Sequence, residues 1–390
     1  MEHAVQRPRT VSTTAGQRVQ RGQRGQSSGG RWLAKAIGLY ILIRMFLVFK
    51  SGLPQPQDFY AAVLFVLAVR PANLLWVAKA FRPYILFVAW VAIVNTSWAA
   101  LRMEPRYFLH MSFQIFNLCM FAIVTSTRRK HREHFDLWAV RAVTAGAICE
   151  AVLITGWGEM VRAHGTFNNP NQLGYWAINL FGIYLVAQPK RSYWDLVALG
   201  PLVYIELATT SRAGLVAISV MVGIWLYELL RRNPNRYLYI AVMVIGFLGL
   251  ASSTAMTSFI TNMEFSESLE ARFSKDSSVD EVGKRNTDRI SHYPGYAILG
   301  AGEGDLTRFP HSLNTIEIHS TPMTVLFSYG IPGTILFWGF LFVLARRLSW
   351  SHRGIVAALI VYSITHQGMR FAYFWILVGM LASEQPNRKR

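Results

Sequence analysis

The side chains that could do chemistry are few in this chain, and they gather in short polar segments between long apolar runs. The candidates are His164, Asn168, Asn169, Asn171, Arg212, Arg289, Glu317, His319 and Arg370. An arginine fork binds phosphate oxygens in bidentate fashion and stays charged, and a neutral imidazole can take a proton from a hydroxyl. Helix N-termini also attract anions. These residue types fit a site that holds a phosphate group and activates a hydroxyl.

Three of these segments also have a structural explanation. Arg212, in ELATTSRAGLVAI, can be a topological anchor that reaches the headgroups as well as an anion ligand. GTFNNPNQLGYW can be a turn followed by an asparagine-capped helix. His319, which stands just before an apolar run, can simply contact headgroups. The residues alone leave both interpretations open.

The elements that must position these residues are predicted to be membrane-spanning helices. The chain is 52% hydrophobic and 15% charged, whereas soluble domains have about 25% charged residues. Apolar runs of roughly 17 to 25 residues match the length of a transmembrane helix. We expect an all-α, polytopic bundle of about 11 to 12 spans. They lie near residues 33–49, 59–78, 83–101, 107–125, 138–157, 172–188, 194–210, 212–230, 237–259, 321–345 and 354–383.

The distribution of lysine and arginine predicts which loops face the cytoplasm. The net charge of +18 falls mostly in every second connection, which is the positive-inside pattern and makes nucleic-acid binding unnecessary as an explanation. Residues 1–32 are expected to form a disordered basic cytoplasmic tail, 33–383 a transmembrane catalytic domain and 384–390 a second basic tail. The loop at 260–320, far longer than the others, is expected to face outward with the candidate residues.

The last apolar stretch, 354–383, is too long for one ordinary span and is interrupted by His366, Gln367, Gly368 and Arg370. We therefore expect two part-length helices that meet at this polar break. Cys119 and Cys149 lie inside apolar runs, so neither a disulfide nor a metal site is expected. GAGEGD at 300–305 lacks the strand and helix that a dinucleotide-binding loop needs.

Four segments resemble the O-antigen ligase and polymerase superfamily of bacterial polysaccharide enzymes. They are GTFNNPNQLG at 165–174, TTSRAGL at 209–215, the stretch from Arg289 to Gly304 and IHSTPMTVLFSYGIPG at 318–333. The resemblance implies a GT-C-like transferase that moves a glycan from a polyprenyl (undecaprenyl) diphosphate to an acceptor hydroxyl at the periplasmic face. It matches Arg212, Arg289 and His319 to the family's catalytic residues. Ser320 departs from the asparagine that often follows the family's histidine.

The expected mechanism needs no metal and no cofactor. A diphosphate is a good leaving group, so arginines that neutralise its charge and a base at His319 suffice, and direct displacement inverts the anomeric centre. The remaining candidates, Glu317 and Arg370 among them, are expected to bind substrate. Glu206 could assist His319 or belong to a buried ion pair.

The partners implied are the lipid-linked donor, a glycan or lipid A core acceptor, the lipid bilayer and other polysaccharide export proteins. The expected location is the bacterial inner membrane, with a periplasmic active site and a cytoplasmic N-terminus. Polymerase, ligase and protein O-oligosaccharyltransferase remain alternatives within the enzyme class. A polytopic transporter, or a non-catalytic component of an export complex, is the alternative outside it.

Overall fold

The computed structural model describes residues 28–49, 53–158, 162–232, 289–305, 308–309 and 317–384, and these ranges contain helices and no strand. The helices are α2 (Ser28–Ile43), α3 (Pro56–Ala68), α4 (Pro71–Ala80), α5 (Arg82–Arg102), α6 (Arg106–Lys130), α7 (Arg132–Gly156), α8 (Pro170–Ala187), the 3₁₀ turn η1 (Tyr193–Asp195), α9 (Leu196–Thr209), α10 (Arg212–Arg232), α15 (Arg289–His292), α16 (Tyr296–Leu299), α17 (Thr321–Arg346), α18 (Trp350–Thr365) and α19 (Ala372–Ala382). The predicted all-α class is confirmed for this part of the chain. The predicted span at 237–259, both tails and most of the long loop lie outside it.

Five described helices are long and apolar enough to cross a membrane: α5, α6, α7, α10 and α17. The pair α3 and α4 would make a sixth if it counts as one span, but the two helices meet at a 97° bend. The prediction of one continuous span at 59–78 is therefore wrong. The bend is caused by Pro71, because a proline disfavours helical geometry in the residue before it. Arg70 is accordingly extended (φ −110°, ψ 143°).

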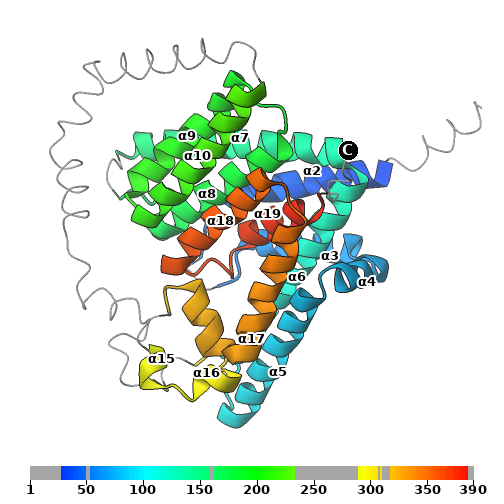
Figure 1. Ribbon diagram of the computed structural model, residues 1–390, viewed down its shortest axis with the longest axis vertical. Helices are drawn as coiled ribbons and strands as arrows, with labels where there is room; N and C mark the ends of the chain where they lie inside the picture. Colours follow the sequence, from blue (N-terminus) through cyan, green and yellow to red (C-terminus); the bar gives the residue numbers. More distant parts are fainter. Residues whose placement is uncertain are drawn as a thin grey trace, which may run out of the picture.

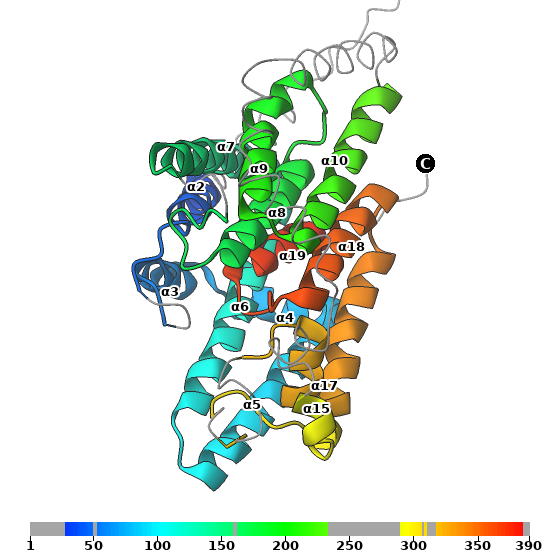
Figure 2. The same cartoon turned by 90° about the vertical axis from the view of Figure 1, so that its left-hand side faces the viewer.

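The helices form a bundle around α19 (Figures 1 and 2). The long helices α5, α6 and α17 run side by side, and α2 and α7 lie together across their direction (Figures 1 and 2). α19 packs against α6 and α8, and every one of its residues is buried. A helix that is apolar all round belongs in such a central position.

The predicted break in the last apolar stretch is confirmed. α18 ends at Thr365 and α19 begins at Ala372, so the polar residues between them form a short connection. Thr321 ties this connection to the start of α17, because its N–H donates to the His366 carbonyl at 3.2 Å and its Oγ1 accepts from the Gly368 N–H at 3.0 Å. Two polar segments that are distant in sequence thus meet at one end of α17.

The glycine-rich segment packs against a kink in α17. Gly330 has φ 65° and ψ −170°, and Pro332 has no N–H to offer the Ser328 carbonyl. That carbonyl accepts instead from the Gly302 N–H at 2.8 Å, and the Phe327 carbonyl accepts from Ala301 at 2.8 Å. This pairing brings Glu303 to the interior of the bundle, where it is 4% exposed.

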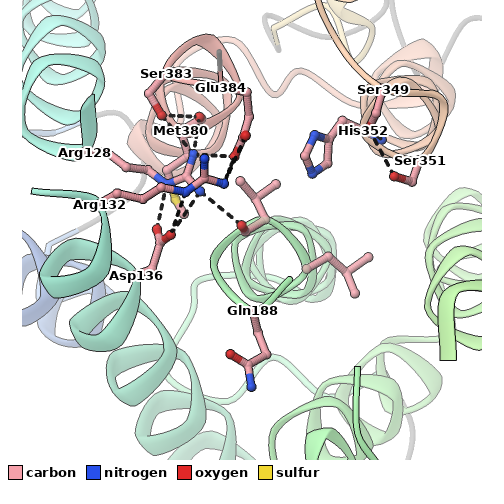
Figure 3. Close-up of polar contacts among 12 residues, drawn as sticks. Arg128, Arg132, Asp136, Gln188, Ser349, Ser351, His352, Met380, Ser383 and Glu384 are labelled. Atoms are coloured by element: carbon pink, nitrogen blue, oxygen red, sulfur yellow. Dashed lines mark hydrogen bonds and ion pairs between the residues drawn. The ribbon is translucent and has the colours of Figure 1, made fainter. Parts of the chain in front are cut away.

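A buried arginine near the C-terminal end of α6 joins α6, α7, α8 and α19 (Figure 3). Arg128 is 1% exposed and donates to both carboxylate oxygens of Asp136, at 2.6 and 3.1 Å, and to Glu384 at 2.7 Å. It also donates to the carbonyls of Met380 and Val186. A buried guanidinium is tolerated only with partners of this kind. Glu384 therefore fixes the end of α19.

Candidate functional site

The structure places five of the nine predicted site residues around one cavity of about 410 Å³: Asn169, Asn171, Glu317, His319 and Arg370. The cavity lies where the segment after α2, α3, α6, the start of α8, the segment before α17 and the break between α18 and α19 come together. Among these, the segments before α8 and α17 belong to loops that are expected to face outward. Arg128 follows Ser112, a lining residue, by sixteen positions on α6, about 24 Å along the helix.

Arg370 stands in the cavity wall between two carboxylates. Its Nη1 donates to Oε1 of Glu317 at 2.5 Å, and its Nε donates to Oε2 of Glu303 at 3.1 Å. Gln367 Nε2 donates to the second oxygen of Glu303 at 3.4 Å. The Arg370 side chain is 16% exposed and lines the cavity, so a ligand there can contact it. This wall connects the glycine-rich segment, the segment before α17 and the α18–α19 break.

A second cavity of about 50 Å³ shares Glu317, Gln367 and Arg370 with the first. Arg289 and His110 line it. Arg289 is 2% exposed, and its guanidinium carbon lies 5.4 Å from the ring centre of Phe309 and 5.9 Å from that of Phe327. Arg289 and His319, two of the three predicted catalytic residues, thus belong to adjacent cavities, with Arg370 in the wall that both share.

The pKa values of the two carboxyl groups beside Arg370, those of Glu303 and Glu317, are shifted in opposite directions. Burial raises the pKa of the Glu303 carboxyl; Arg370 opposes this shift, and the nearby Glu317 adds to it. The Arg370 guanidinium lowers the pKa of Glu317 by more than burial raises it. Two carboxylates that share one cation cannot both be fully stabilised as anions, so the more deeply buried one holds its proton more tightly.

His319 is exposed and lines the larger cavity directly before α17. Its neighbour Ser320 is 3% exposed and caps α17, because its side chain accepts from the Met323 N–H. Asparagine at this position would cap equally well. Serine and asparagine are therefore interchangeable as the cap of α17 at position 320. The serine found here leaves His319 at the cavity.

The asparagines before α8 have separate roles. Asn169 is the N-cap of α8, with its side-chain oxygen accepting from the Gln172 N–H at 2.9 Å, as the capping explanation predicts. Asn171 lines the cavity, and its carbonyl accepts from the Tyr362 hydroxyl at 2.6 Å. Tyr362 in turn stacks on His366, with ring centres 4.4 Å apart. The first turn of α8 thus forms part of the cavity lining.

The structure leaves three predicted residues outside both cavities. Arg212 is half-buried at the first position of α10, and it lines neither cavity. His164 and Asn168 are exposed in the loop before α8, where the Asn168 amide donates to the Phe49 carbonyl at 3.4 Å. Glu206 lies between α8, α9 and α10, and its carboxylate accepts from Thr209 at 3.4 Å.

Several lining residues were not predicted: Arg44, Gln55, Asp58, His110 and Glu303. Arg44 falls within a predicted apolar span, and a charged residue there is itself a signal of function. Glu303 lies in GAGEGD, a glycine-rich segment that predicts turns. The sequence does not reveal that Arg44 lies beside Asp58 or that Glu303 pairs with Arg370.

No protein-family model matches this chain, and a search of curated proteins finds no match either.

Proposed function

We propose that this protein is a polytopic membrane glycosyltransferase of the O-antigen ligase and polymerase type. It takes a glycan from a polyprenyl diphosphate and transfers it to an acceptor hydroxyl at the periplasmic face of the bacterial inner membrane. The proposal includes the eleven to twelve spans, the cytoplasmic N-terminus and the GT-C-like layout expected from the sequence.

The observation that carries the proposal is the mixed character of the 410 Å³ cavity. One part of its lining is polar and includes His319, Arg370 and the first turn of α8. The other part is apolar and consists of Leu47, Leu53, Phe59, Ala62, Phe113 and Phe116. A lipid-linked glycan has the same division into a polar and a hydrocarbon portion, and such a pocket fixes a ligand by a few polar groups on an apolar surface.

The residues present suit displacement at an anomeric carbon. His319 takes the proton of the acceptor hydroxyl as that oxygen attacks, and the glycosidic C–O bond to the diphosphate breaks with inversion. Arg370 and Arg289 lie where their charge offsets the negative charge that grows on the leaving group. Asn171 and Glu317 can orient sugar hydroxyls by hydrogen bonding.

The test is transfer by the purified full-length protein in nanodiscs, with a polyprenyl-diphosphate oligosaccharide as donor and EDTA present. The proposal predicts transfer that survives chelation, and the product identifies the acceptor: longer lipid-linked glycan, glycosylated lipid A core or glycosylated protein. Donor binding without transfer to any of these acceptors would favour a transporter or a non-catalytic export component.

A further inference from the structure

Arg44 lines the larger cavity, and two of its buried hydrogen-bond donors have no partner among the described residues. It follows the last turn of α2, its side chain is 15% exposed, and it lines the cavity together with Gln55 and Asp58. Its Nε lies 3.5 Å from Oδ1 of Asp58. Within the described ranges, neither Nε nor Nη1 has a hydrogen-bond partner. A buried N–H group without a partner is costly, so an acceptor that reaches it gains more than the usual hydrogen-bond energy.

Asp58 holds the arginine without saturating it. The Asp58 carboxylate is fixed by the Gln55 N–H at 2.8 Å and by the Tyr40 hydroxyl at 3.4 Å. A guanidinium has five N–H donors, of which the contacts of Arg44 with Asp58 and Tyr40 use a minority, and a phosphate can take two of the others as a fork. Asp58 thus orients Arg44 and at the same time competes with any anion that binds there.

The apolar part of the cavity begins beside Arg44. Leu47 and Leu53 belong to the segment that follows Arg44, Phe59 and Ala62 to α3, and Phe113 to α6. Leu53 and Phe59 are 52% and 64% exposed. These side chains give the cavity a hydrocarbon lining in addition to the Arg44 cation. A free anion would bury no hydrocarbon on that lining. A lipid phosphate would bind the cation with its phosphate and cover the apolar side chains with its hydrocarbon chain.

We propose that Arg44 binds the phosphate of an isoprenoid diphosphate whose hydrocarbon chain lies on the apolar surface formed by Leu47, Leu53, Phe59, Ala62 and Phe113. This assignment rests on the proposed function for the choice of an isoprenoid, and it places the phosphate next to the hydrocarbon chain on the α2–α3 side of the cavity. Arg370 and Arg289 then remain for the phosphate that bears the sugar, and His319 for the acceptor.

Binding to the full-length protein in nanodiscs tests this site, with polyprenyl diphosphate, uncharged polyprenol and inorganic pyrophosphate as probes. Arg44→Gln should weaken binding of polyprenyl diphosphate by about 10-fold or more and leave polyprenol binding unchanged. Arg106→Gln, which removes an exposed arginine that pairs with Glu104, is the matched control. Pyrophosphate that binds as tightly as the lipid would contradict the hydrocarbon part of the site.

Asp58 separates a ligand-binding role from a structural one. If Arg44 binds the phosphate, Asp58→Asn removes a competitor, and the diphosphate should bind as tightly as before or more tightly. The double variant Arg44→Gln, Asp58→Asn leaves no unpaired charge, so it should fold and still bind weakly. Wild-type affinity in the folded double variant would overturn the assignment.

These results are distinguishable from those that test the transferase itself. Arg44-dependent binding with no transfer to any acceptor would refute the proposed function and leave the site intact. Transfer with normal affinity in the Arg44 variants would refute the site alone.

Discussion

Arg370 Nε donates to Oε2 of Glu303 at 3.1 Å, which joins the break before α19 to the glycine-rich segment sixty-seven residues away in the sequence. Glu303 reaches this position because the α17 kink pairs with the backbone of Ala301 and Gly302. The same guanidinium also contacts Glu317 from the segment before His319. One side chain thus connects the three segments that form the wall between the two cavities.

Arg370→Gln should destabilise the protein strongly. The change leaves Glu303, 4% exposed, as a buried carboxylate without its cation, and breaking such a pair costs about 3 to 5 kcal/mol. Thermal unfolding in detergent measures the loss. The double variant Arg370→Gln, Glu303→Gln should recover most of it. Arg102→Gln, which removes an arginine that is half-exposed beside Asp305, is the control and should cost less than about 1 kcal/mol.

The opposite pKa shifts of Glu303 and Glu317 predict two separate effects of pH on stability. Because the pKa of Glu303 is raised in the folded state, folding is favoured as the pH falls through that value toward the unfolded pKa of about 4.3. Because the pKa of Glu317 is lowered, its contribution is present above about 4.3 and is lost as the pH falls through its folded value.

Melting temperature against pH, compared between wild type and single glutamine variants, checks this order. Glu303→Gln should remove the gain at mildly acidic pH, and Glu317→Gln should remove the loss at lower pH. A reversed assignment of the two steps would contradict the geometry around Arg370.

Gly300→Ala should disturb the junction between the glycine-rich segment and α17. Gly300 has φ 101°, and a Cβ there would lie 2.4 Å from the Ser328 carbonyl oxygen. Strain together with a steric clash against backbone is expected to cost about 2 kcal/mol or more. Gly295→Ala is the matched control, because nothing lies within 4 Å of its added Cβ. Equal melting temperatures for the two variants would contradict the packing described.

Asn169 and Asn171 should differ in what they change. Asn169→Ala removes the cap of α8 and should lower stability by about 1 kcal/mol, with little effect on affinity. Asn171 accepts from Tyr362 with its backbone carbonyl, which alanine keeps, so Asn171→Ala should preserve the fold. It removes a polar side chain from the cavity and should therefore weaken ligand binding there. Unfolding and donor-binding measurements on both variants would separate the roles, and the opposite pattern would contradict them.

The length of the apolar runs was enough to predict the position of most described helices, including the break before α19. It failed at Pro71, where apolar residues on both sides of the proline concealed a sharp bend. The site residues were predicted in part, because Arg370 interrupts an apolar run and Glu317 and His319 directly precede one. Arg44 and Asp58 could not be paired from the sequence, since their proximity depends on how α2 returns into α3. Arg212 shows the converse, because a segment can match a family pattern and still lie outside the cavity.

The most direct test of the proposed function is the rate of transfer by His319→Ala beside that of His134→Ala, a substitution of an exposed histidine at the start of α7. Both variants are measured with the donor lipid bound at saturation. Loss of the base should lower the rate by about 10²- to 10⁴-fold in His319→Ala and leave donor affinity unchanged, whereas His134→Ala should transfer at the wild-type rate. Equal rates in the two variants would contradict catalysis at this cavity.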